Sequence, residues 1–203
     1  MTWVKVCGIT SREALEAAHE GGADAVGFVV APDSPRRIGL ADARAFIESS
    51  ELPSYIVSVD LTDPEVLEVM RYTGAEGIQP HGRHGVTVME SAVDHGCKVL
   101  FPIPVDASGP RTDPASIPHH VMPILVTAAA GVHGGTGSTF DWSLVSHVDR
   151  PFVLAGGLDL GNVRDAVASV RPFGVDASSG LEIAPGIKDP DSIRAFIKEA
   201  KSA

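Results

Sequence analysis

Cysteine, positive charge and long apolar runs are all scarce in this chain of 203 residues. Its two cysteines, Cys7 and Cys97, could pair, but in a reducing compartment two lone cysteines are more often free thiols. Lysine and arginine number 16 against 26 acidic residues, and the formal net charge of -10 disfavours a nucleic-acid partner or an anionic membrane. No run reaches the length of a membrane span and residues 1–3 do not begin a signal peptide, so we expect a cytoplasmic protein.

Linkers and metal-ligand clusters are missing as well. The chain is 44% hydrophobic and contains no segment that marks a domain boundary, so we expect one domain over residues 1–203. Four of the 8 histidines occur in pairs, His81 with His84 and His119 beside His120. Neither pair has a cysteine or carboxylate at ligand spacing, so the sequence does not predict a metal site.

What the chain does contain is a regular alternation of short apolar runs with amphipathic stretches of helical length. Strands are predicted at 3–7, 24–30, 54–59, 76–79, 97–102, 121–127, 151–155 and 173–177. Helices are predicted at 11–21, 40–49, 63–73, 85–95, 141–148, 160–170 and 190–201, and the proline-rich connection 110–118 has room for only a turn of helix.

This pattern predicts a closed parallel sheet. Runs such as 25–30 and 151–155 are apolar throughout, as strands covered on both faces must be. Eight βα units form a (β/α)8 barrel, for which 203 residues suffice if the loops are short. A doubly wound open sheet is the alternative, but it would want several glycines after the first strand, where Gly8 stands alone. In a barrel, the chemistry lies at the carboxyl ends of the strands.

The first predicted strand ends at Cys7. Strand alternation places Lys5 and Cys7 on one face, and Thr10 with Glu13 has capping-box spacing, so a helix begins just after the cysteine. A cation two residues back and a helix N-terminus nearby are surroundings that favour the thiolate. The alternative is that Cys7 is a small hydrophobic residue of the core.

Glycine-rich segments follow the last three predicted strands, at 134–137, 155–158 and 175–180. Glycines let the backbone approach an anion, and the loops after strands seven and eight form the usual phosphate site of a barrel. A tight turn would explain any one segment alone. Together they predict phosphate binding by Gly135, Gly156, Gly157, Ser178, Ser179 and Gly180.

Segments from one end of the chain to the other carry a resemblance to a known family: 5–10 (KVCGIT), 22–29 (GADAVGFV), 34–38 (SPRRI), 79–82 (QPHG), 134–142 (GGTGSTFDW), 155–158 (AGGL) and 175–180 (VDASSG). The chain resembles the phosphoribosylanthranilate isomerases of tryptophan biosynthesis. The resemblance implies a small phosphosugar substrate and an Amadori rearrangement without a cofactor, in which phosphoribosylanthranilate becomes carboxyphenylamino-deoxyribulose phosphate.

The resemblance also implies roles for four residues. Cys7 matches the general base, and Arg36 matches an arginine that contacts the anthranilate, whose carboxylate suits a guanidinium. A surface arginine, like Arg37 beside it, is the alternative for Arg36. His81 contacts the substrate or makes a structural hydrogen bond, and Asp176 has a positioning role beside the phosphate.

The sequence differs from the family pattern at the position of the general acid. The family's aspartate at the end of strand six has no counterpart in 124–135, which contains no carboxylate. Ungapped placement puts Thr127 in the catalytic position and a slip of one residue puts Val126 there, and neither protonates a ring oxygen usefully near neutral pH. The lysine that usually follows the glycine run is replaced by Ser138, and 58–62 departs from the family's apolar run.

Three explanations for the acid stay open at this point. Asp60, Asp176 or His133 takes over its role; ordered water does so with a loss of roughly 10²- to 10⁴-fold; or the chain is an impaired variant that still binds the phosphosugar. The leading function is the isomerase. The alternatives are a catalytically silent phosphosugar-binding barrel and an isomerase for another phosphorylated sugar, and the chain is expected to be a monomer or a homodimer.

Overall fold

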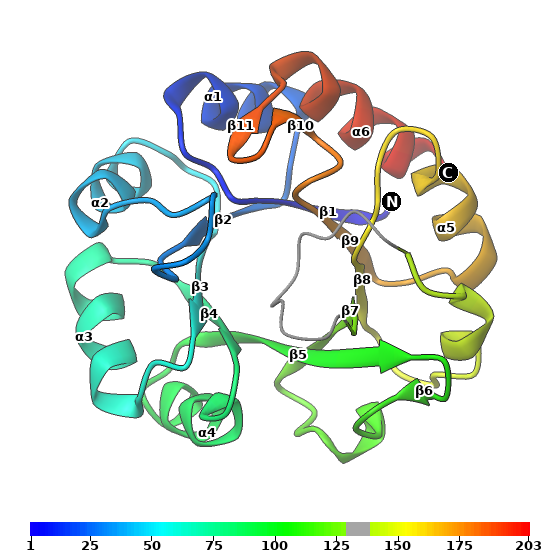
Figure 1. Ribbon diagram of the computed structural model, residues 1–203, viewed down its shortest axis with the longest axis horizontal. Coiled ribbons are helices and arrows are strands. Elements are labelled where there is room, and N and C mark those ends of the chain that lie inside the picture. The colour runs from blue at the N-terminus through cyan, green and yellow to red at the C-terminus, as the bar shows by residue number, and fades with distance from the viewer. Residues whose placement is uncertain (129–138) are drawn as a thin grey trace.

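Parallel strands form the centre of the computed structural model, which describes residues 1–128 and 139–203. Its first and last parallel strands pair with each other, and β4 pairs with β5, so the eight described parallel strands close on themselves (Figure 1). The predicted (β/α)8 barrel is confirmed, and the open doubly wound sheet is wrong. The parallel strands are β1 (Trp3–Cys7), β2 (Ala25–Val29), β3 (Ser54–Val59), β4 (Gly77–His81), β5 (Lys98–Asp106), β7 (Met122–Thr127), β8 (Val153–Ala155) and β9 (Gly174–Ala177).

Alternation along β1 separates an apolar face from a polar one. Val4 and Val6 are fully buried in the main hydrophobic core, which lies between the sheet and the helices. Lys5 and Cys7 share the other face, as predicted, and this face lines the barrel interior. Because this interior is closed to water at the depth of Lys5, a charge placed there must be paired.

Helices cover the outside of the barrel (Figure 1). Their inward faces follow helical spacing; in the last helix, Ile193, Phe196, Ile197 and Ala200 are buried at i, i+3, i+4 and i+7. The described α-helices are α1 (Arg12–Gly21), α2 (Leu40–Glu48), α3 (Asp63–Thr73), α4 (Gly85–Asp94), α5 (Val163–Val170) and α6 (Pro190–Ser202).

The cap of α1 differs from the prediction. Ser11 is the N-cap, and its side chain accepts a hydrogen bond from the backbone N–H of Ala14 at 3.2 Å. The Thr10 hydroxyl instead donates to the carbonyl of Gly186 at 2.8 Å. Thr10 therefore ties the end of β1 to the loop that follows the last barrel strand.

The connections after β5 and β7 contain 3-10 helices. The predicted helix 141–148 is wrong: the chain forms only a 3-10 helix, η2 (Trp142–Val145), which Asp141 caps. The Ser146 hydroxyl donates to the carbonyl of Ser143 at 2.8 Å and so competes with continuation of the helix. The proline-rich connection holds one turn, η1 (Pro114–Ser116), as expected.

Two short hairpins were not predicted. β6 (Gly109–Pro110) folds back on the end of β5, and β10 (Glu182–Ala184) pairs with β11 (Ile187–Lys188) between β9 and α6. Both cysteines are free thiols, as predicted. Within 1–128 and 139–203, no cluster of His, Cys, Asp and Glu is arranged to hold a metal ion. None of the helices in that part of the chain combines the length and apolarity that a membrane crossing needs.

Candidate functional site

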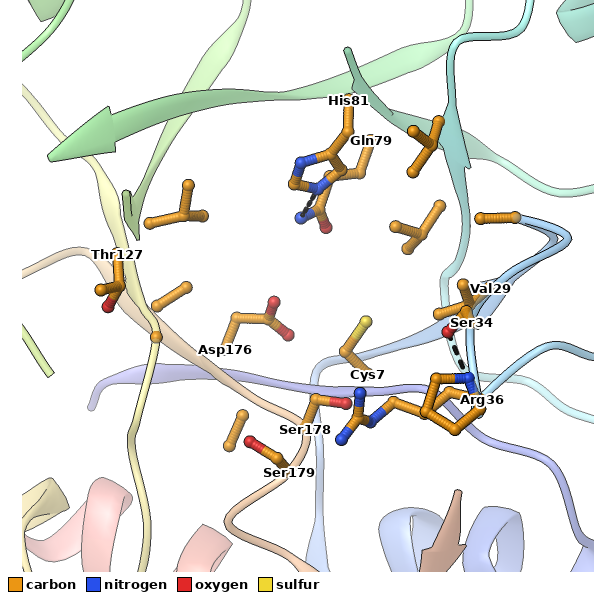
Figure 2. Close-up of a pocket in the computed structure, with 18 of the residues that line it drawn as sticks. Cys7, Val29, Ser34, Arg36, Gln79, His81, Thr127, Asp176, Ser178 and Ser179 are labelled. Carbon is orange, nitrogen blue, oxygen red and sulfur yellow. Dashed lines mark hydrogen bonds between the residues drawn. The ribbon is translucent and has the colours of Figure 1, made fainter. Parts of the chain in front are cut away.

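A cavity of about 510 Å³ opens at the carboxyl ends of the barrel strands. Most of the residues singled out from the sequence line it together (Figure 2). Gly180 lies outside the lining and supports it from behind, and Gly135 falls outside the described residues. The predicted residues in the lining are Cys7, Arg36, His81, Thr127, Gly156, Gly157, Asp176, Ser178 and Ser179.

The surroundings of Cys7 depend on a missing side chain. A Cβ on Gly27, in the neighbouring strand β2, would lie 3.0 Å from Cys7 Sγ and 3.1 Å from Lys5 Nζ. Glycine at this position therefore leaves the space in which the thiol and the ammonium group meet. Burial raises the pKa of the Cys7 thiol above 9.0, and the cations Lys5 and Lys188 oppose it only in part. The expected preference for thiolate is thus outweighed by desolvation.

A chain of polar contacts connects the buried Lys5 to three residues that line the cavity, Asp176, Gln79 and His81. Lys5 Nζ donates to Asp176 Oδ1 at 2.9 Å and to Gln79 Oε1 at 3.0 Å. Because Oε1 accepts from the ammonium group, the amide nitrogen of Gln79 faces His81 Nε2, at 3.0 Å, and donates to it. His81 therefore accepts at Nε2, and its structural hydrogen bond is observed. Gln79 is a site residue that sequence reasoning missed.

The ion pair at the centre of this chain is buried. Lys5 is fully buried and Asp176 nearly so. Burial lowers the pKa of the Lys5 amine, but Asp176 and Cys7 together outweigh it and the pKa lies above the ordinary 10.5. Burial raises the pKa of the Asp176 carboxyl above 3.8, and Lys5 only partly opposes the shift. Asp176 is thus closer to protonation than an exposed aspartate.

The loop after β8 requires its glycines. Gly156 and Gly157 have φ values of +96° and +65°, which side chains rarely adopt. A Cβ on Gly156 would also lie 2.2 Å from Thr127 Oγ1, so the end of β7 packs against this loop. Asn162, the N-cap of α5, donates from its side chain to the Gly157 carbonyl at 2.8 Å. The helix that follows therefore fixes the loop, as the sequence predicts.

The loop after β9 is joined to the loop after β8. Gly180 forms a bridge with Asp159, and a Cβ on Gly180 would lie 2.1 Å from the carbonyl oxygen of Leu158. Only glycine permits this approach. Gly180 thus brings the two loops side by side, and Ser178 and Ser179 line the cavity next to Gly157.

Arg36 lies in the loop after β2 and is held by a residue that the sequence analysis did not consider. Its Nε and Nη2 donate to the two carboxylate oxygens of Glu182 at 2.7 and 2.9 Å. Gly8, with φ of +77°, lets the side chain pass, since a Cβ there would lie 2.9 Å from Arg36 Cδ. Arg37 is exposed. Arg36 therefore lines the cavity in a fixed position and is not a surface arginine.

Glu182 and Lys188 are the charged groups that sequence reasoning missed. Both belong to the β10–β11 hairpin, and Lys188 Nζ is hydrogen-bonded to Glu182 Oε1. The dipeptide Pro185–Gly186 between them is a turn signal that could have predicted the hairpin. No periodic pattern, however, indicates that its two charges turn inward.

The candidate acids lie in different environments. Thr127 ends β7 and lines the cavity beside the loop after β8. Asp60, with the unusual φ of +57°, accepts from the backbone N–H of Arg83 at 2.7 Å and from its Nη2 at 3.3 Å. Asp176 faces the cavity between Thr127 and Cys7 (Figure 2). His133 lies outside the described residues.

Fold and site together define a (β/α)8-barrel protein with a thiol, a carboxyl group and a held arginine converging at the mouth of the barrel. Residues 4–199 match the family model described as N-(5'phosphoribosyl)anthranilate (PRA) isomerase. The isomerase of Thermotoga maritima is 41% identical over 208 residues, covering 99% of each chain. The chain belongs to the phosphoribosylanthranilate isomerase family, a family of tryptophan biosynthesis.

Solved structures agree with this assignment. Monomers generated from the dimeric Thermotoga maritima isomerase match with a TM-score of 0.85 and 35% identity, covering 100% of both chains. An isomerase in complex with reduced 1-(o-carboxyphenylamino)-1-deoxyribulose 5-phosphate matches with a TM-score of 0.86 and 36% identity, again over 100% of both chains. The family resemblance of the sequence is thereby confirmed.

Proposed function

We propose that this chain converts N-(5'-phosphoribosyl)anthranilate to 1-(2-carboxyphenylamino)-1-deoxyribulose 5-phosphate, with Cys7 as general base and Asp176 as general acid. The observation that carries the proposal is the convergence of Cys7, Asp176 and Arg36 on one cavity in a full-length member of the isomerase family. A related isomerase binds the reduced form of this product, which supports the same class of ligand here. The reaction needs no cofactor, because it only moves protons.

The substrate has two anionic ends, and the cavity offers a partner for each. The phosphate is proposed to lie on the loops after β8 and β9, where Gly156, Gly157, Ser178 and Ser179 present backbone N–H groups and hydroxyls. Gly180 supports this site from behind, and Gly135 is assigned to it by family resemblance alone. The anthranilate carboxylate is proposed to meet Arg36, with His81 at the opposite wall of the cavity.

The proton steps balance without an external reagent. The Asp176 carboxyl gives its proton to the ring oxygen, the ring opens to a Schiff base, and Cys7 as thiolate removes the proton on C2′ to leave an enolamine. The enolamine becomes the ketone by tautomerisation. Lys5, hydrogen-bonded to Asp176 and adjacent to the thiol, is placed to move a proton from the Cys7 thiol to the Asp176 carboxylate before each turnover, which supplies the thiolate and the carboxylic acid that these steps need.

Asp176 is preferred to the other candidates for a physical reason. Asp176 lines the cavity together with Cys7, and burial raises the pKa of its carboxyl group, which is the direction that a general acid needs. The Asp60 side chain, by contrast, is 37% exposed and accepts two hydrogen bonds from Arg83. Thr127 has no proton that it can give up in this pH range.

The test is turnover of phosphoribosylanthranilate by the purified protein and by its base and acid variants. Cys7→Ser and Asp176→Asn are each expected to lower kcat by roughly 10²- to 10⁴-fold, the usual contribution of a positioned base or acid. Binding of the reduced product should change little, which separates lost chemistry from lost folding. Normal turnover by C7S or D176N would remove that residue from its proposed role.

The alternatives give different outcomes in the same experiment. A silent phosphosugar-binding barrel would bind the reduced product without turnover, and Thr127→Asp would then create activity. An isomerase for another sugar would show a Michaelis constant for phosphoribosylanthranilate that Arg36→Met leaves unchanged. Sedimentation analysis shows whether the chain is a monomer or, like the Thermotoga maritima relative, a dimer.

A further inference from the structure

Two charged residues beside the cavity have no role in the chemistry proposed above. The side chains of Glu182 and Lys188 are 4% and 1% exposed, and both lie on the β10–β11 hairpin. Burying a carboxylate and an ammonium group is costly unless each is fully paired. Their partners are groups of the candidate substrate site.

Lys188 has no donor left for a ligand. Its ammonium group has three protons, and three acceptors surround it: Glu182 Oε1, the Ser178 carbonyl at 3.2 Å and Ser178 Oγ at 3.3 Å. Because Oγ accepts from Lys188, the proton of the Ser178 hydroxyl must point elsewhere. Ser178 lines the cavity at the proposed phosphate site, so this proton is available to an anion there.

Glu182 restricts Arg36 in the same way. Its two oxygens occupy one edge of the guanidinium group, formed by Nε and Nη2. The edge formed by Nη1 and Nη2 still carries protons that can bind a second carboxylate in a forked arrangement. Arg36 and Ser178 are close neighbours, since a Cβ on Gly8 would lie 2.9 Å from Arg36 Cδ and 3.0 Å from Ser178 Oγ. Two cations share one carboxylate here, which leaves an excess positive charge beside the cavity.

We propose that Glu182 and Lys188 form a positioning pair, which presents the outer edge of Arg36 and the hydroxyl proton of Ser178 to the two anionic ends of one substrate. The inference rests on the proposed function, because it takes the anthranilate carboxylate and the phosphate as those two ends. Neither residue touches the substrate. Each acts through the group that it holds.

Double-mutant cycles test this arrangement. Glu182→Gln should raise the KM for phosphoribosylanthranilate roughly 10-fold or more and change kcat much less, because it loosens a charge-assisted fork. In an Arg36→Met background, the same substitution should add almost nothing. Additive effects in this cycle, or an equal loss in kcat, would overturn the role of Glu182.

The other end of the pair is measured without turnover. Lys188→Met should weaken the binding of inorganic phosphate, followed by calorimetry, and should have no further effect in a Ser178→Ala background. Phosphate affinity that K188M leaves at the parent value would overturn the role of Lys188. Should E182Q fail to fold, this second cycle tests the same pair.

Matched controls come from an exposed pair. Lys98 and Glu76 form an ion pair of 2.7 Å at the start of β5, and both side chains are about half exposed. Lys98→Met and Glu76→Gln should leave KM and phosphate affinity unchanged. If the parent protein binds phosphate without turning over phosphoribosylanthranilate, the proposed reaction fails, whereas the K188M comparison still decides the inference.

Discussion

Two buried lysines act on the pKa of Cys7, and their surroundings differ in one respect. Lys5, on β1, has the Asp176 carboxylate for its ion pair, and its pKa is raised. Lys188, on β11, shares the Glu182 carboxylate with Arg36. Burial lowers the pKa of Lys188, Glu182 offsets the shift only in part, and the positive charge of Arg36 adds to it.

The difference indicates that a carboxylate stabilises the charged form of a buried lysine less when it also binds a second cation. The Lys5–Asp176 pair is neutral as a unit and belongs to the strands of the barrel. The cluster of Arg36, Glu182 and Lys188 keeps an excess positive charge and belongs to the loop after β2 and to the β10–β11 hairpin, outside the barrel strands. We therefore regard the first as a structural and proton-handling pair and the second as a charged support for an anionic ligand.

The largest expected effect breaks the first pair. Lys5→Met leaves the Asp176 carboxylate buried without its cation, and should lower the free energy of unfolding by about 3 to 5 kcal/mol. Lys188→Met should cost less, because Arg36 still neutralises Glu182. Urea denaturation of both variants measures the difference. Equal losses would mean that sharing a carboxylate does not matter here.

A smaller effect follows from the space beside Gly27. Gly27→Ala places a methyl group within about 3 Å of Cys7 Sγ and Lys5 Nζ, and crowding of this kind typically costs about 1 to 3 kcal/mol. We also expect slower alkylation of Cys7 by iodoacetamide at alkaline pH, because the displaced ammonium group no longer supports the thiolate. Gly96→Ala is the control for a glycine whose Cβ would meet open space, although its φ of +78° adds local strain. Alkylation of G27A at the parent rate would contradict the assigned contact.

The residues of the first pair could be located from the sequence far better than those of the second, although the contact between them was not predicted. Strand alternation placed Lys5 and Cys7 on one face, and the glycine loops at 156–157 and 178–180 were located from their own pattern. Asp176 was identified through family resemblance. Period-two alternation is a strong rule within a strand, so the spacing of residues on barrel strands is enough to assign each of them to a face.

Loop residues escaped prediction for a physical reason. Glu182 and Lys188 are separated by a turn and face inward because Arg36, far away in the sequence, donates to Glu182 and Ser178 accepts from Lys188. No local periodicity records such a partner. The same applies to the failed helix at 141–148, where serine side chains compete for backbone groups and the helix ends after four residues.

At alkaline pH, the two lysines should change the free energy of unfolding in opposite directions. The raised pKa of Lys5 means that its stabilising contribution is fully present below 10.5 and is lost as pH rises through the folded-state value. The lowered pKa of Lys188 has the opposite effect, so stability rises with pH between its folded-state value and 10.5. Each lysine contributes a slope of at most about 1.4 kcal/mol per pH unit.

The measurement is the difference in unfolding free energy between the parent and each lysine variant across this range. Cys7 also titrates here, because its raised pKa lowers stability above pH 9.0, and both lysines act on that pKa, so the parent and both variants carry Cys7→Ser in this comparison. The two difference curves should slope in opposite directions. Parallel curves would refute the contrast between the two sites.

The smallest effect is expected at the exposed pair. Lys98→Met removes an ion pair with Glu76. Its separation of 2.7 Å equals that of the buried Arg36–Glu182 pair, yet its loss should change stability by about 1 kcal/mol or less. Thermal unfolding provides the measurement. A loss as large as that of K5M would show that burial does not set the worth of these pairs.

The contact between Gln79 and His81 fixes which groups donate and which accept along the polar chain of Lys5, Gln79 and His81. An ammonium group can only donate, so the amide can have only one orientation, and that orientation determines which ring nitrogen of His81 is left to accept. A proton arriving on Nε2 would turn this acceptor into a donor facing another donor. The uncharged amide of Gln79 thus links His81, which lines the cavity, to a buried lysine at the centre of the barrel, and fixes the hydrogen-bonding role of each of its two neighbours.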